Sequence, residues 1–367
     1  MIQSISFKNF KCFERQKIKC AGLTLLSGLN GMGKSSVLQS LLLLRQSQQA
    51  NLLTTAGLVL NGDLVNLGRA RDLFYDNATK DLLEIAVTWK ANREAIWRFD
   101  YDSSADVLAP SNYEVNQEIY HANLFTDHFH YIQAERLGPR TSFPMSDFAV
   151  NKHGQIGSRG EYTAHFLESY GEKVIQEGLL LHPSTDSNRV LEQTNAWLSE
   201  ISPGVRLHLT MTQSMDLANL EYSFDGVGNR YRSTNVGFGL TYTLPVLAAL
   251  LASDPGSLIL IENPEAHLHP RGQAKLGELI ARAAAAGRQI IFETHSDHVL
   301  NGIRVAAHRG LILPDDVAIH FFNREEGRTR VMSPRLDRNG RLDQWPEYFF
   351  DEWDRQLEIL LDPPAES

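Results

Sequence analysis

The sequence predicts an α/β protein in which a mixed sheet carries a phosphate-binding loop, with an antiparallel β-lobe and a small helical lobe attached. Two observations predict this fold class. The stretch Gly28-Leu29-Asn30-Gly31-Met32-Gly33-Lys34-Ser35-Ser36 fits the pattern G-x-x-x-x-G-K-[ST], between an apolar run at 23–26 and a helical run at 37–44. Later, apolar runs at 257–261 and 289–292 flank an Ala- and Leu-rich helix at 273–286, as parallel strands joined by a crossover helix do.

The loop at 28–36 has the residues that phosphate binding needs. Its glycines let backbone N–H groups turn toward an anion, and the following helix adds the partial positive charge of its N-terminus. We expect the Lys34 ammonium to face solvent and meet the β- and γ-phosphates of ATP, and the Ser35 hydroxyl to bind Mg²⁺. The predicted cofactor-binding residues of the loop are Asn30, Gly31, Gly33, Lys34, Ser35 and Ser36. The alternative is a glycine-rich turn that only precedes a helix.

Composition and charge exclude several classes of protein. The chain has 367 residues, 43% of them hydrophobic and 22% charged, which is typical of a globular protein with a sizeable core. It has no apolar run of membrane-spanning length and no signal peptide at its N-terminus, so we expect a cytoplasmic protein without membrane contact. Cys12 and Cys20 lack zinc or redox spacing and are expected to be reduced. The net charge of −9 does not indicate nucleic-acid binding, although it leaves room for a local basic groove.

The elements divide the chain into four parts. The phosphate-loop half, 1–75, opens with a strand at 2–7 and a second strand near Ile18. The β-lobe and helical insert, 76–230, contain a hairpin at 82–89 and 95–101, a strand at 130–133, helices at 162–170 and 190–201, and strands at 207–211 and 220–224. The part at 231–335 holds the two buried strands, and 336–367 forms a C-terminal module. In the loop after residue 133, Arg136 and Arg140 either reach a phosphate or a partner subunit, or pin the loop through ion pairs.

Polar residues follow the two buried strands. Glu262 ends the first strand, and His295 comes just after the second. Because the carboxyl ends of parallel strands meet at one edge of a sheet, we expect both residues beside the phosphate loop. Glu262 is the predicted Mg²⁺-associated acid, and His295 is expected to contact the γ-phosphate or position the attacking water. A structural role for His295 is the alternative, and the spacing of the nearby histidines does not favour a metal site.

A glycine-rich stretch at 235–241 precedes an apolar helix at 242–251. Gly237 and Gly239 could expose backbone amides to a phosphate at this helix N-terminus, or could form a turn that allows close packing. Both interpretations stay open from these residues alone.

Together these motifs resemble a known family. The phosphate loop, Gly237 to Gly239, the run Ile-Glu-Asn-Pro-Glu-Ala-His-Leu-His-Pro at 261–270 and the run Glu-Thr-His-Ser at 293–296 resemble the ordered motifs of ABC-class ATPases. The His-Leu-His-Pro and Thr-His-Ser runs resemble the RecF and OLD (overcoming lysogenization defect) branch, AAA-type ATPases of bacterial defence systems. The tail at 339–352 resembles a C-terminal module of unassigned function found on some of these ATPases.

The resemblance implies one P-loop ABC-ATPase head, assembled from both ends of the chain. Two copies would sandwich ATP, with Lys34 and Ser35 of one copy facing Gly237 to Gly239 of the other. Asn263 stands where such proteins usually carry the catalytic glutamate, so either Glu265 or His295 takes over that role or turnover is slow. We favour slow turnover and a long-lived ATP-bound dimer.

The stretch after His295 is too short for the nuclease domain of OLD proteins. We therefore expect an ATPase subunit that controls a separately encoded effector, such as a nuclease, in anti-phage defence. A RecF-like DNA-repair clamp and a non-hydrolysing scaffold that binds nucleotide are the alternatives.

Aromatic and acidic residues crowd the C-terminal module. The rings belong to Trp345, Tyr348, Phe349, Phe350 and Trp353. Such rings could dock a partner or a second copy, or could close the core of the head. The resembling module usually has glycine where Tyr348 stands, so the local turn is expected to differ.

Overall fold

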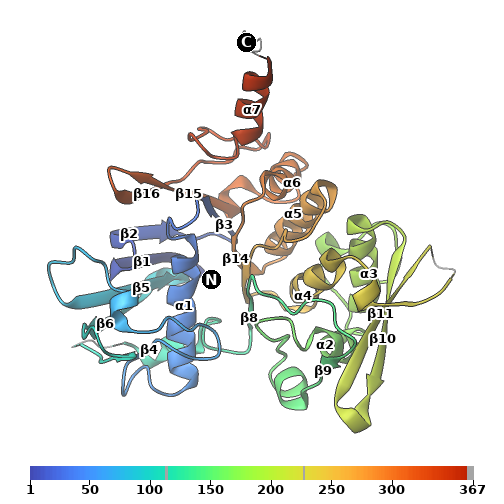
Figure 1. The fold of residues 1–367 in the computed structure, drawn as a ribbon, viewed down its shortest axis with the longest axis horizontal. Coiled ribbons are helices and arrows are strands. Elements are labelled where there is room, and N and C mark those ends of the chain that lie inside the picture. Colours follow the sequence, from blue (N-terminus) through green and yellow to red (C-terminus); the bar gives the residue numbers. More distant parts are fainter. Residues whose placement is uncertain (112–114, 226–227, 362–367) are drawn as a thin grey trace, which may run out of the picture.

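The computed structural model describes residues 1–111, 115–225 and 228–361 (Figure 1). Its strands are β1 Ile2–Phe10, β2 Phe13–Lys19, β3 Leu23–Gly28, β4 Leu58–Val59, β5 Leu82–Trp89, β6 Arg93–Asp100, β7 Val107–Leu108, β8 Phe129–Ile132, β9 Phe143–Pro144, β10 Val205–Thr212, β11 Leu217–Phe224, β12 Tyr231–Arg232, β13 Leu258–Glu262, β14 Gln289–Glu293, β15 Val317–Glu325 and β16 Arg328–Met332. Its α-helices are α1 Lys34–Gln49, α2 Thr163–Tyr170, α3 Val190–Ile201, α4 Phe238–Ala252, α5 Pro270–Ala285, α6 Asp297–His308 and α7 Glu352–Leu361.

The central sheet is mixed, as the sequence predicts. Its strand order is β16-β15-β3-β14-β13-β8, with β16 antiparallel to β15 and all other neighbours parallel. Strand β14 therefore lies between the strand of the phosphate loop and the strand that ends in Glu262. In the register, Glu262 pairs with Glu293, and Glu293 pairs with Leu26 of β3. The three strands thus end together at one edge of the sheet.

The buried strands divide their side chains between two cores, because successive residues of a strand point to opposite faces. Leu258 and Leu260 of β13 join the core that contains α1 and the antiparallel sheet β2-β1-β5-β6. Ile259 and Ile261 join the core that contains α4, α5 and α6. This burial on both faces explains why the strand reads as a continuous apolar run.

The antiparallel β-lobe and the helical lobe lie on either side of this sheet (Figure 1). The predicted hairpin at 82–101 is β5 and β6, and its turn has positive φ at Ala91 and Asn92. The helical lobe contains strands as well as helices. Trp197 of α3 shares its core with Leu207 of β10 and Leu220 of β11, so these strands pack on the helices rather than forming a separate unit.

Two helices begin earlier than their apolar patterns predict. Helix α4 starts at Phe238, after Gly237, and α5 starts at Pro270. Proline suits the first position of a helix because it needs no N–H partner there. His269 caps α5, its ring accepting a hydrogen bond from the backbone N–H of Arg271. In the three described ranges, no helix is long and apolar enough to cross a membrane.

The C-terminal module divides its rings between core and surface. Phe349 is fully buried, with its ring 5.2 Å from that of Phe321 and 5.3 Å from that of Trp345. Trp345 and Trp353 are 45% and 71% exposed, and α7 stands off the rest of the molecule (Figure 1). Tyr348 has a φ of 66°, a conformation that favours glycine. Residues 362–367 of the predicted module lie outside the described ranges.

Candidate functional site

The phosphate loop joins β3 to α1 in the order that the motif requires. Gly28, Gly31 and Gly33 have φ values of 136°, 75° and 99°. A Cβ at Gly33 would overlap the Cys12 sulfur and lie 2.7 Å from the ring of Phe13, so only glycine fits there. Gly33 precedes α1 without a side-chain cap, and the first turn holds no acidic residue. The loop and the N-terminus of α1 therefore suit an anion such as a nucleotide phosphate.

Lys34 is buried, contrary to the expectation that its ammonium faces solvent. The residue is 3% exposed, and Nζ donates hydrogen bonds of 2.9 Å to the carbonyl oxygens of Gly28 and Leu29. The same Nζ lies 3.9 Å from Glu293 Oε1. Burial lowers the pKa of Lys34, and the Glu293 carboxylate opposes that shift. The ammonium is thus held at the place where the loop would meet phosphates.

Glu293 is the functional candidate that sequence reasoning missed. It is the last residue of β14, and its Oε2 accepts a hydrogen bond of 2.7 Å from the Ser35 hydroxyl. Burial raises the pKa of Glu293, while Ser35 and Lys34 act in the opposite direction. The sequence pattern that indicates Glu262 also applies to Glu293, because each residue ends a buried apolar strand.

Glu262 lies at the same sheet edge but is held from the other side. Its Oε1 accepts a hydrogen bond of 3.0 Å from the Tyr131 hydroxyl, and its Oε2 accepts one of 3.1 Å from the backbone N–H of Ala134. Burial raises the pKa of Glu262. Arg136 is buried and donates to the backbone carbonyls of Glu262 and Asn263. It therefore pins the loop through carbonyl groups rather than through the ion pairs expected from the sequence.

His295 and Glu265 lie next to the phosphate-loop residues. The backbone N–H of His295 donates to Glu265 Oε1 at 2.8 Å, and His295 Nε2 is 3.8 Å from Glu293 Oε1. Burial and then the charge of Lys34 lower the pKa of His295, which favours the neutral ring, while Glu265 acts in the opposite direction. Glu265 Oε2 and Asn263 Oδ1 are buried and make no hydrogen bond to the described residues. Both atoms therefore keep an unused capacity to accept a hydrogen bond inside the fold.

Gly237 and Gly239 lie apart from the phosphate loop of their own chain. They flank Phe238 at the start of α4, which belongs to the opposite core from α1. A Cβ at Gly239 would lie 2.6 Å from the carbonyl oxygen of His267, so this glycine permits close packing. A Cβ at Gly237 would meet no atom within 4 Å, and Phe238 is 56% exposed. The exposed side of the motif can therefore face another molecule.

The residues at the loop fit Mg²⁺ as well as ATP. In the described part of the chain, no three His, Cys, Asp or Glu side chains form a metal-binding group. Mg²⁺ in nucleotide sites needs only one or two protein oxygens, because water and phosphate complete its shell. The Ser35 hydroxyl with a neighbouring carboxylate meets that requirement.

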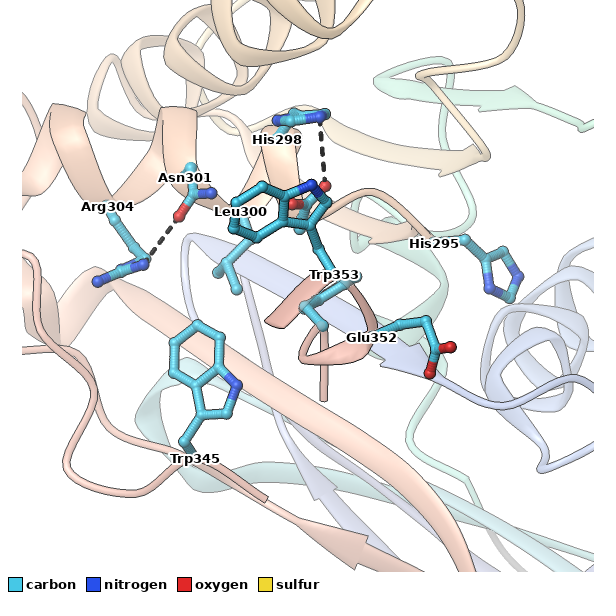
Figure 2. A pocket seen from close by; sticks show the side chains of 10 residues that line it. His295, His298, Leu300, Asn301, Arg304, Trp345, Glu352 and Trp353 are labelled. Carbon is cyan, nitrogen blue, oxygen red and sulfur yellow. Dashed lines mark hydrogen bonds and ion pairs between the residues drawn. The ribbon is translucent and has the colours of Figure 1, made fainter. Parts of the chain in front are cut away.

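A cavity of about 620 Å³ lies beside this site (Figure 2). It is bounded by His295 and the first turns of α6 on one side and by the C-terminal module on the other. In the view of Figure 2, Glu352 lies nearest His295, while Trp345 and Arg304 lie farther away. The Arg304 guanidinium is 5.4 Å from the Trp345 ring. The C-terminal module thus forms a wall next to the candidate γ-phosphate histidine.

Comparison with known families divides the chain into two matched segments. Residues 23–301 match the family described as "AAA domain, putative AbiEii toxin, Type IV TA system". Residues 312–360 match a family described as "Protein of unknown function (DUF3696)". No curated protein matches the chain.

Solved structures match the fold over nearly the whole chain. A Smc head bound to the C-winged helix domain of ScpA has 14% sequence identity and a TM-score of 0.56, over 91% of this chain and 98% of that one. An Smc head domain with an extended coiled coil, bound to the C-terminal domain of ScpA and derived from Pyrococcus furiosus, has 13% identity and a TM-score of 0.55, over 98% and 99%. The predicted ABC-ATPase head is thereby confirmed as a fold.

Proposed function

This chain belongs to the family of AAA domains matched at residues 23–301, and from that premise we propose that it binds ATP with Mg²⁺ and hydrolyses it slowly. The observation that supports this function is the convergence of Lys34, Ser35, Glu293 and His295 at the phosphate loop. Mg²⁺ bound there would offset the charge of the phosphates. Glu262, the metal-associated acid expected from the sequence, ends the neighbouring strand at the same sheet edge.

The proposed hydrolytic residues are Glu265 and His295. Glu265 Oε2 is buried and has no hydrogen-bond partner among the described residues, so this oxygen would be free to accept a proton from an attacking water that reaches it in the ATP-bound form. The His295 ring can donate a hydrogen bond to the γ-phosphate. The amide of Asn263 cannot act as a base in the place where ABC-class ATPases usually carry a glutamate. Turnover is therefore slow, and the ATP-bound form is long-lived.

ATP would join two copies of the chain. Gly237 and Gly239 present the exposed N-terminus of α4 away from their own phosphate loop. The glycine motif of a second copy would therefore complete the phosphate loop. The solvent-facing Phe238 between them supports a contact with another chain.

A test of slow turnover uses Asn263→Glu, with Asn263→Gln as a control of the same size. If the missing acid limits hydrolysis, Asn263→Glu should raise phosphate release by up to about 100-fold and shorten the life of the dimer measured by light scattering, because a general base typically contributes 10²- to 10⁴-fold. Asn263→Gln should do neither. Stable ATP binding with no phosphate release from wild type or either variant would favour the non-hydrolysing scaffold.

We further propose that the cycle controls a separately encoded effector in the cytoplasm, and that the chain belongs to the RecF and OLD branch with a role in anti-phage defence. The toxin–antitoxin wording of the matched family supports that context. The cavity shared by His295 and the C-terminal module supports partner docking, because Trp345 and Trp353 are exposed there.

The partner proposal is tested by co-purification with the proteins encoded beside this chain. Trp353→Ala should lose the partner while ATP binding stays normal. Phe148→Ala removes an equally exposed ring, 71% exposed, from the other lobe and should retain the partner. DNA that stimulates phosphate release without any protein partner would favour the RecF-like clamp instead.

A further inference from the structure

The Ser35 hydroxyl has a defined orientation. Its hydrogen bond to Glu293 Oε2 joins residues from distant parts of the chain, and Glu293 is only 6% exposed. A hydroxyl that donates its proton in one direction turns its lone pairs elsewhere, where they can bind a cation. The buried carboxylate that sets this orientation also lies close to Lys34.

The two strand-end acids differ in what they touch. Each oxygen of Glu262 already accepts a hydrogen bond, from Tyr131 or from the backbone of Ala134, on the β8 side of the sheet. Glu293 instead lies on the strand between β13 and β3, directly beside the phosphate loop. A cation bound by the Ser35 hydroxyl would therefore lie beside the Glu293 carboxylate rather than beside that of Glu262.

We propose that Glu293 and Ser35 form the protein side of the Mg²⁺ site, and that Glu262 holds the neighbouring strand end through Tyr131 and Ala134. The proposal rests on the proposed ATP binding. It assigns the metal to the end of β14, which follows α5, rather than to the end of β13, which precedes α5. Hydroxyl and carboxylate oxygens are the hard ligands that Mg²⁺ prefers, and their contact in the fold makes the site ready before the cation arrives.

The test measures ATP affinity by calorimetry, once in excess Mg²⁺ and once in EDTA, so that the ratio reports the contribution of the metal. Glu293→Gln should reduce this ratio on the order of 10- to 100-fold, the usual loss when a metal site loses a supporting group. In EDTA the same variant should bind ATP at least as tightly as wild type, because it removes a negative charge near the phosphates. Glu168→Gln, on an exposed position of α2, is the matched control and should equal wild type.

A merely structural Glu293 would lower both affinities together, which would overturn the proposal. An unchanged ratio in Glu293→Gln, with a collapsed ratio in Glu262→Gln, would return the metal to the strand of Glu262. Glu293→Asp keeps the charge and should fall between wild type and Glu293→Gln. It serves as the decisive variant if Glu293→Gln unfolds. Absence of ATP binding by wild type in both buffers would instead overturn the proposed function itself.

Discussion

Phe349→Ala separates the two roles of the C-terminal module. The ring is completely buried and contacts the rings of Phe321 and Trp345, so truncation leaves a cavity that rigid neighbours cannot fill. Buried phenylalanine cut to alanine costs about 3–5 kcal/mol. Trp353→Ala is the matched control, because a ring that is 71% exposed should change the free energy of unfolding by no more than about 0.5 kcal/mol.

Urea unfolding followed by tryptophan fluorescence and circular dichroism measures both variants. We expect Phe349→Ala to lower the midpoint with an unchanged slope, which identifies a loss of stability rather than a change in compactness. If Phe349→Ala unfolds at the wild-type midpoint, the module does not close the core. A large loss in Trp353→Ala would show that α7 packs on the head in solution.

Three further predictions concern charge and catalysis. Lys34→Ala should abolish ATP binding measured by calorimetry. It should also lower the free energy of unfolding by about 1–3 kcal/mol, because the carbonyls of Gly28 and Leu29 and a buried carboxylate lose their donor. Normal ATP affinity would refute the assignment of this site. His295→Ala should lower phosphate release more than ATP affinity, since a residue acting on the γ-phosphate contributes mainly in the transition state; equal phosphate release from both proteins would leave this histidine a structural role. Burial lowers the pKa of His130 to about 4. Below about pH 6.5 the unfolded chain therefore binds a proton at this histidine that the folded state does not. The free energy of unfolding should fall as the pH drops from about 6.5 to about 4. The urea midpoint measured across this range should fall less in His130→Phe, and an equal fall in both proteins would contradict the prediction.

The sequence by itself determined the elements whose signals are local. The phosphate loop could be recognised because its glycines, lysine and serine act within one short segment between a strand and a helix. The two strands at 257–261 and 289–292 could be placed because burial on both faces requires an unbroken apolar run. The parallel sheet then followed from the helix between them, and with it the expectation that Glu262 and His295 share one edge.

Only the tertiary structure decided which side chains meet at that edge. Ser35 and Glu293 are 258 positions apart, and their contact exists because β14 lies between β3 and β13. The sequence likewise does not predict the burial of Lys34, because its hydrogen-bond partners are backbone carbonyls, which every residue carries. In the C-terminal module, the sequence does not distinguish the environments of Phe349 and Trp353, yet Phe349 is buried and Trp353 is exposed. The sequence shows that aromatic side chains are present, whereas the packing of segments that are distant in the chain decides which of these side chains become buried.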